Sequence, residues 1–112
     1  MDQQYSWKTQ FESELQQAES ARASGNEGKA RVCARRAAGA VVAEYLRRQG
    51  IKLERASTYT HLKYLIDLQD ISPDLRKTAE HFLLQVTPER SLPIHADLIG
   101  EARWLAVYLL QD

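Results

Sequence analysis

The chain is poor in the features that usually fix a protein's compartment or its cross-links. Its 112 residues include a single cysteine, Cys33, so no disulfide can form within the chain. Basic and acidic residues balance at 15 each, which argues against a whole-molecule electrostatic grip on nucleic acid or an anionic membrane but does not exclude a local basic patch. No apolar stretch approaches a membrane span, and the polar residues 1–5 are unlike a signal peptide. We therefore expect a soluble, cytoplasmic protein folded as one domain over residues 1–112.

Several catalytic signatures are also missing. The sequence has no glycine-rich phosphate loop, no paired cysteines, no His-Glu-x-x-His metal site and no serine nucleophile elbow. Metal enzymes and nucleotide-cofactor enzymes are therefore unsupported, and we expect neither a metal nor a cofactor. Cys33 lies among alanines in a helical pattern, which favours a small buried core residue over a reactive thiol.

Nearly all of the chain follows a helical pattern. Strand-like alternation is absent, and apolar residues recur at helical spacing. The pattern predicts helices over residues 6–23, 29–49, 57–68 and 73–86, and a last helix that follows Pro93 and continues nearly to the C-terminus. Ser72 and Pro73 form the sharpest helix start. The fold class we expect is all-α: an antiparallel up-down helical bundle of four long helices plus a shorter one.

The apolar faces of these helices identify a candidate core. The residues expected inside the first four helices are Trp7, Phe11, Leu15 and Ala18; Ala30, Ala34, Ala37, Ala38, Val41 and Tyr45; Tyr59, Leu62, Leu65 and Ile66; and Leu75, Ala79, Phe82 and Val86. The inner face of the second helix is small, and small side chains let a neighbouring helix axis come close. We therefore expect the second helix to be the central one.

The last helix is apolar nearly all round. A core row of Leu98, Ala102, Leu105 and Leu109 is accompanied by a second row of Ile99, Trp104, Val107, Tyr108 and Leu110. Such a helix is either fully buried or covered by a partner. We expect a homodimer through this helix, with Trp104, Val107 and Tyr108 at the interface, and full burial remains the alternative.

The best candidate for a catalytic site is Arg90 with His95. The pair flanks a bend that contains Pro93, just before the last helix. A guanidinium binds phosphate and an imidazole moves a proton, and metal-independent RNA cleavage needs both. An ordinary surface loop is the alternative interpretation.

Two other histidines also follow an arginine. Arg55 and His61 straddle a loop and a helix start, so they could converge on a nucleic acid, or His61 could be a structural residue. Arg76 and His81 lie within one helix, where five positions turn the side chains apart, and Arg76 is expected to pair with Glu80 instead.

Basic residues also gather on the second helix. Arg31 and Arg35 share one face and are candidates for a phosphate-backbone contact, with a solvated helix face as the alternative. Further along, Arg47, Arg48 and Lys52 continue the basic run, and Glu44 can pair with either arginine.

The order of these motifs resembles the HEPN (higher eukaryotes and prokaryotes nucleotide-binding) domain family over residues 11–110. The carriers of the resemblance are Ala34-Arg35-Arg36-Ala37-Ala38 and Glu44-Tyr45-Leu46 closed by Gly50, then Thr60-His61-Leu62, then Glu89-Arg90, then Ile99-Gly100-Glu101-Ala102-Arg103-Trp104-Leu105. In active family members, an arginine followed four to six residues later by a histidine marks a metal-independent endoribonuclease that is typically dimeric, and Arg90 and His95 match that spacing. Other members serve as toxin–antitoxin partners, for which the resemblance implies a nucleotidyltransferase-like protein.

Three hypotheses follow for the function. The leading one is a small HEPN-like protein that binds a nucleotide or RNA, or that acts as a toxin–antitoxin-associated partner, without assured catalysis. The first alternative is an endoribonuclease in which His95 transfers protons and Arg90 steadies the phosphate at a dimer interface. The second is a purely structural protein-interaction module.

Overall fold

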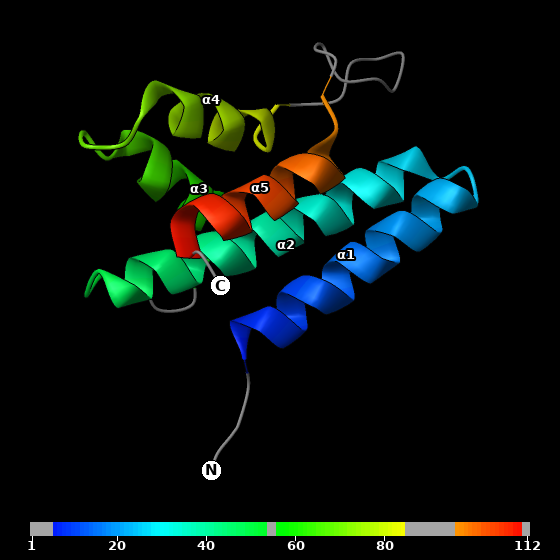
Figure 1. Ribbon diagram of the computed structural model, residues 1–112, viewed down its shortest axis with the longest axis horizontal. Coiled ribbons are helices and arrows are strands. Elements are labelled where there is room, and N and C mark those ends of the chain that lie inside the picture. The colour runs from blue at the N-terminus through cyan, green and yellow to red at the C-terminus, as the bar shows by residue number, and fades with distance from the viewer. Residues whose placement is uncertain (1–5, 54–55, 85–95, 111–112) are drawn as a thin grey trace.

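The described part of the chain is entirely helical. The computed structural model describes residues 6–53, 56–84 and 96–110, and Figure 1 shows their arrangement. Over these ranges the chain forms α1 (Trp7–Ala23), α2 (Glu27–Arg48), α3 (Thr58–Asp67), α4 (Pro73–His81) and α5 (Leu98–Leu110), and no strand. The all-α prediction is confirmed, but α3 and α4 are both short, with 10 and 9 residues, so the predicted four long helices are wrong.

Side-chain caps determine where four of the helices begin. In each case the oxygen of a serine or asparagine accepts a hydrogen bond of 3.1 Å from a backbone N–H that the first helical turn leaves unpaired. The cap and donor pairs are Ser6 with Lys8, Asn26 with Lys29, Ser57 with Thr60 and Ser72 with Leu75. The predicted start at Ser72-Pro73 is confirmed, because Pro73 occupies the first turn of α4.

Three of the helices end in one of two ways, at a glycine with a positive φ or in a tightened last turn. Gly25 and Gly50 have positive φ values of 86° and 82°, which the turn after α1 and the turn after α2 require. α4 ends at His81, earlier than the predicted residue 86, because its last turn tightens. The N–H groups of Phe82 and Leu83 bond three residues back, to Ala79 and Glu80, instead of four.

α2 is the central helix, as the small residues on its inner face predict. It lies between α1 and α5 in Figure 1, and it also packs against α3. Its inward side chains are small and completely or almost completely buried, among them Ala30, Cys33, Ala34, Ala37, Ala38, Val41 and Val42. Fully buried large side chains from the other helices, such as Phe82, Leu62 and Leu105, complete the core around it.

The directions of the helices depart from a simple up-down bundle. α1 and α2 form an antiparallel hairpin, whereas α5 runs alongside α2 in the same general direction. α3 and α4 lie together at the side of this group (Figure 1). In the described part of the chain, none of the helices is both long enough and apolar enough to cross a membrane.

Gly39 brings the start of α3 unusually close to α2. A Cβ at this position would lie 2.8 Å from both Cγ2 and Oγ1 of Thr58, nearer than real Cβ contacts. The missing side chain therefore lets the first residue of α3 sit directly on the α2 backbone. This contact fixes where the first turn of α3, including His61, lies relative to α2.

Several predicted core positions differ from the structure. Trp7, Phe11, Tyr45 and Leu109 are only half-buried against the core, and Val86 lies outside the described residues. Tyr59 was expected inside α3 but is 58% exposed, because Leu62, Leu65 and Ile66 alone form the buried face. The second row of α5 splits into two groups. Ile99 and Leu110 are buried, whereas Trp104, Val107 and Tyr108 are exposed.

Candidate functional site

A cavity of about 270 Å³ opens where α2 ends and α3 begins. Its walls come from the last turns of α2, the following connector and the first turn of α3. The lining residues are Ala43, Leu46, Arg47, Ile51, Lys52, Leu53 and His61. Apolar walls thus meet two cationic side chains and an imidazole in one small space, and we call it the His61 cavity.

His61 is held at the cavity by the way α3 starts. Ser57 caps the helix, and its carbonyl oxygen accepts the backbone N–H of His61 at 3.0 Å. The side chain is half-buried. Burial lowers the pKa of His61 below its usual value, and a hydrogen bond to the Ser57 backbone opposes this only in part. Burial therefore favours the neutral imidazole, in which one nitrogen donates and the other accepts a hydrogen bond.

Arg47 stands at the cavity wall in a fixed orientation. It donates two hydrogen bonds to the Glu44 carboxylate, at 2.8 and 2.7 Å, and Arg48 donates a third at 2.8 Å. Hydrogen bonds from Arg47 and then Arg48 outweigh burial and lower the pKa of Glu44 to about 2. Glu44 was predicted to pair with Arg47 or with Arg48, and it pairs with both. Lys52 is exposed and adds an ammonium group to the cavity lining.

A second cavity adjoins the first. It has a volume of about 260 Å³, and it shares Ala43 and Arg47 with the His61 cavity. Trp7 and Gln10 of α1 form its other wall, and Ala40 and Glu44 complete it. A ligand that enters beside His61 could therefore extend across Ala43 toward the indole of Trp7.

The structure separates the predicted site residues. Arg90, His95 and Arg55 lie outside the described residues, so their predicted roles stay predictions. Arg31 and Arg35 are half-buried on the N-terminal half of α2, and about 18 Å of helix separates Arg35 from Arg47 at the cavity. Arg31 and Arg35 are thus not part of the His61 cavity.

One atom of Arg35 is also unusual. Its Nε and the Oε1 of Glu14 are buried and have no hydrogen-bond partner among the described residues. A buried polar atom without a partner costs stability. Because part of Arg35 is committed to the protein interior, it is a poorer candidate for binding a phosphate backbone than its sequence position indicates.

Arg76 and His81 diverge, as predicted, but both have unexpected partners. Arg76 donates to the carbonyl oxygens of Ile66 and Leu68, at 3.1 and 2.6 Å, and thereby closes the C-terminal end of α3 instead of pairing with Glu80. The Nδ1 of His81 lies 2.8 Å from Oε1 of Glu101, which joins α4 to α5.

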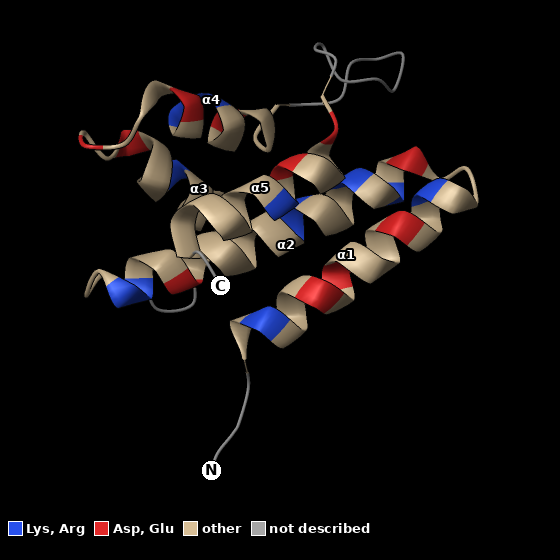
Figure 2. Ribbon diagram, viewed as in Figure 1, with Lys and Arg blue, Asp and Glu red and all other residues tan. Residues whose placement is uncertain are grey.

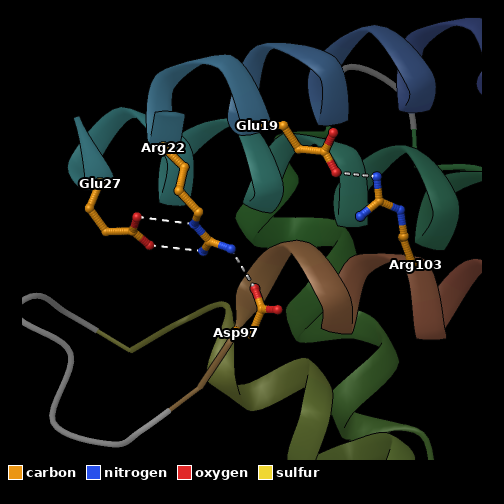
Figure 3. A network of polar contacts seen from close by, with 5 residues as sticks. All are labelled: Glu19, Arg22, Glu27, Asp97 and Arg103. Atoms are coloured by element: carbon orange, nitrogen blue, oxygen red, sulfur yellow. Dashed lines mark hydrogen bonds and ion pairs between the residues drawn. The ribbon is translucent and has the colours of Figure 1, made fainter. Parts of the chain in front are cut away.

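Ion pairs join α5 to the hairpin of α1 and α2 (Figure 3). Arg22 donates to both carboxylate oxygens of Glu27, at 3.1 and 2.9 Å, and to Asp97 at 3.0 Å. These two carboxylates, Glu27 first, raise the pKa of Arg22. Further along α5, Arg103 donates to Glu19.

The state of Asp97 follows from these contacts. Burial favours its neutral form, but the hydrogen bonds from Arg22 and from the backbone of Gly100 outweigh burial and lower the pKa of Asp97. Its carboxylate therefore stays charged at the N-terminus of α5, where a negative charge is favourable. Asp97 lies 75 residues from Arg22 in the chain, so no local sequence pattern could have indicated this pair.

No group of three or more His, Cys, Asp or Glu side chains among the described residues could hold a metal ion. Cys33 is buried, as predicted. Comparisons of the chain with protein-family models, with curated proteins and with solved structures find no match.

Proposed function

We propose that this protein is a small helical binding module of the HEPN-like kind that takes a nucleotide, or a nucleotide of an RNA, in the His61 cavity. The observation that supports the proposal is the meeting of apolar walls, two cationic side chains and a half-buried imidazole in one cavity. A nucleotide has matching parts, namely a flat apolar base and an anionic phosphate. The proposed role is therefore binding of the nucleotide, with no catalytic step.

The two parts of the ligand would occupy different parts of the cavity. The base packs against Leu46, Ile51 and Leu53, because these walls are apolar. The phosphate lies at the lining residue Lys52, whose ammonium group is exposed and so accessible to it, with Arg47 contributing through its remaining donors. The neutral His61 supplies a hydrogen-bond donor and acceptor for the ribose.

Ligand titration tests this proposal directly. Nucleoside 5′-monophosphates are added to the protein, and binding is followed by calorimetry and by the ring signals of His61. We expect His61→Ala and Lys52→Ala each to weaken binding by about tenfold, which corresponds to about 1.4 kcal/mol. Lys63→Ala is the matched control, because Lys63 lies on the exposed side of α3, paired with Asp67, and should leave binding unchanged.

Two results would contradict the proposal. Absence of binding at millimolar nucleotide would exclude the ligand class, and binding that is insensitive to His61→Ala and Lys52→Ala would exclude the cavity. RNA cleavage that is abolished by His95→Ala would replace the binding module by the endoribonuclease alternative.

A protein-interaction role is a second candidate, and a specific observation favours it. Trp104, Val107 and Tyr108 form an exposed apolar face on α5, although large apolar side chains are usually covered. Figure 2 shows α5 as a mostly uncharged helix. We propose that this face carries self-association into a homodimer, or contact with a toxin–antitoxin partner such as a nucleotidyltransferase-like protein.

A further inference from the structure

A groove runs between the first half of α1 and α5. Two cavities of about 400 and 250 Å³ share Phe11, Glu12 and Arg103, so they form one continuous depression. Trp7 and Val107 line it at one end, and both Trp7 and Phe11 are only half-buried. Because α1 packs mainly along α2 and touches α5 much less, the groove is open. We call it the α1–α5 groove.

A ridge stands beside the groove on the same helix. The rings of Trp104 and Tyr108 stack, with centroids 4.8 Å apart, and both side chains are partly exposed. Tyr108 also donates a hydrogen bond of 3.1 Å to Ser72, so the ridge is anchored to the start of α4. A rigid aromatic pair of this kind loses little conformational entropy when it is covered.

Val107 lies between the ridge and the groove. It lines the groove, it precedes Tyr108 directly, and at 64% it is the most exposed large apolar residue of the described chain. One patch therefore carries a projecting ridge, a receiving groove and an apolar residue between them. A two-fold contact pairs each feature of one copy with the complementary feature of the other.

We propose that the α1–α5 groove receives the Trp104–Tyr108 ridge of a second copy of this chain, with the two-fold axis passing next to Val107. This inference rests on the self-association included in the proposed function, and it adds α1 and the groove to the interface. The ridge of each copy enters the groove of the other copy. The contact therefore closes as a dimer and does not propagate into a chain of molecules.

The charges of the patch favour a second copy over a nucleic acid. Arg103 lies near the axis, but it is bonded to Glu19 within its own chain, so the two copies do not bring bare like charges together. The groove lining carries two cations, Lys8 and Arg103, and two anions, Glu12 and Glu19, so it offers no net positive charge to a phosphate backbone. The formal net charge of the chain at pH 7 is zero, so two copies approach without long-range repulsion.

Charge substitutions at Val107 test the position of the axis. Each of Val107→Glu and Val107→Lys places like charges face to face across the axis, and we expect each to weaken the dimer by at least tenfold in sedimentation equilibrium. Mixing the two variants should restore a dimer, because one carboxylate then faces one ammonium group. Val32→Glu is the matched control, since Val32 is an exposed valine of α2 that lines none of the cavities described above, and it should leave association unchanged.

Further outcomes separate this inference from the proposed function. Circular dichroism melts should show that the Val107 variants remain folded, and their nucleotide titrations should match the unsubstituted protein. A monomer at millimolar concentration, a dimer that tolerates Val107→Glu, or a mixture of the two variants that stays monomeric would each overturn the inference. Loss of nucleotide binding by His61→Ala alone concerns the His61 cavity and leaves the dimer in place.

Discussion

Replacing Gly39 by alanine should destabilise the protein, although alanine is the better helix former. In a helix interior this exchange ordinarily stabilises by about 1 kcal/mol. Here the new Cβ would lie 2.8 Å from two γ atoms of Thr58 and 3.1 Å from its Cβ, whereas ordinary contact begins at 3.4 Å. Rotating the Thr58 side chain cannot relieve the contact with its Cβ. The start of α3 must therefore move away from α2.

The size of the effect follows from two opposing contributions. Adding a methyl group to a filled contact costs roughly 1–3 kcal/mol, and three simultaneous short distances place Gly39 toward the upper end. Subtracting the gain in helix propensity of about 1 kcal/mol leaves a net loss of about 1–2 kcal/mol. Because His61 moves with the start of α3, nucleotide binding in the His61 cavity should weaken as well.

Urea unfolding of a small set of variants measures this loss. Gly28→Ala in the same helix is the matched control, since its new Cβ would meet only Asn26 Oδ1, at an ordinary 3.8 Å, and it should be neutral or stabilise by up to about 1 kcal/mol. The double variant Gly39→Ala with Thr58→Ala removes both γ atoms from the crowded contact. We expect a coupling of about 1 kcal/mol between the two sites.

Two results would contradict a close approach of α2 and α3. One is a Gly39→Ala variant that is stabilised as much as Gly28→Ala, and the other is a Thr58→Ala substitution that leaves the effect of Gly39→Ala unchanged. Either result would mean that α2 and α3 do not approach each other as closely as the structure shows.

Two further predictions concern charge and core. The carboxylate of Glu44 has a pKa of about 2 in the folded protein, below its unfolded value, so its stabilisation is present above about pH 4.5 and is lost as the pH falls toward 2. Because Arg47 and Arg48 are exposed, this stabilisation is about 1 kcal/mol, and Glu44→Gln should remove it at pH 7 and flatten the acid limb of stability against pH. Phe82→Ala should cost about 3–5 kcal/mol in urea unfolding because the side chain is fully buried, whereas exposed Tyr59→Ala should cost less than about 0.5 kcal/mol, and equal losses would contradict the assigned core.

Local chemistry made much of the helix pattern predictable. Ser57 and Ser72 act as caps because a serine oxygen satisfies a donor within its own first turn, which can be read from adjacent residues. The buried face of α2 was equally readable, since its alanines recur at helical spacing. The end of α4 was not, because a tightening of the last turn leaves no mark in the apolar pattern.

The candidate site was less predictable than the fold. His61 could be singled out because it follows Arg55 at a helix start, but its cavity also needs Ile51 and Lys52, which are brought there by the course of the connector after Gly50. Contacts such as Arg103 with Glu19 join residues 84 positions apart, and they depend on the placement of whole helices. The exposure of Tyr59 likewise depends on which neighbour covers α3, which periodicity alone does not determine.

The alanine face of α2 makes the response of this protein to mutation one-sided. Ala30, Ala34, Ala37 and Ala38 are completely buried, so almost every substitution there adds atoms and very few remove them. Added volume has to be accommodated by separating helices or by forcing the packed side chains around α2 out of their preferred rotamers. Substitutions on the buried face of α2 are therefore limited by crowding more than by loss of contacts. Larger side chains fit without repacking only on the exposed face of α2.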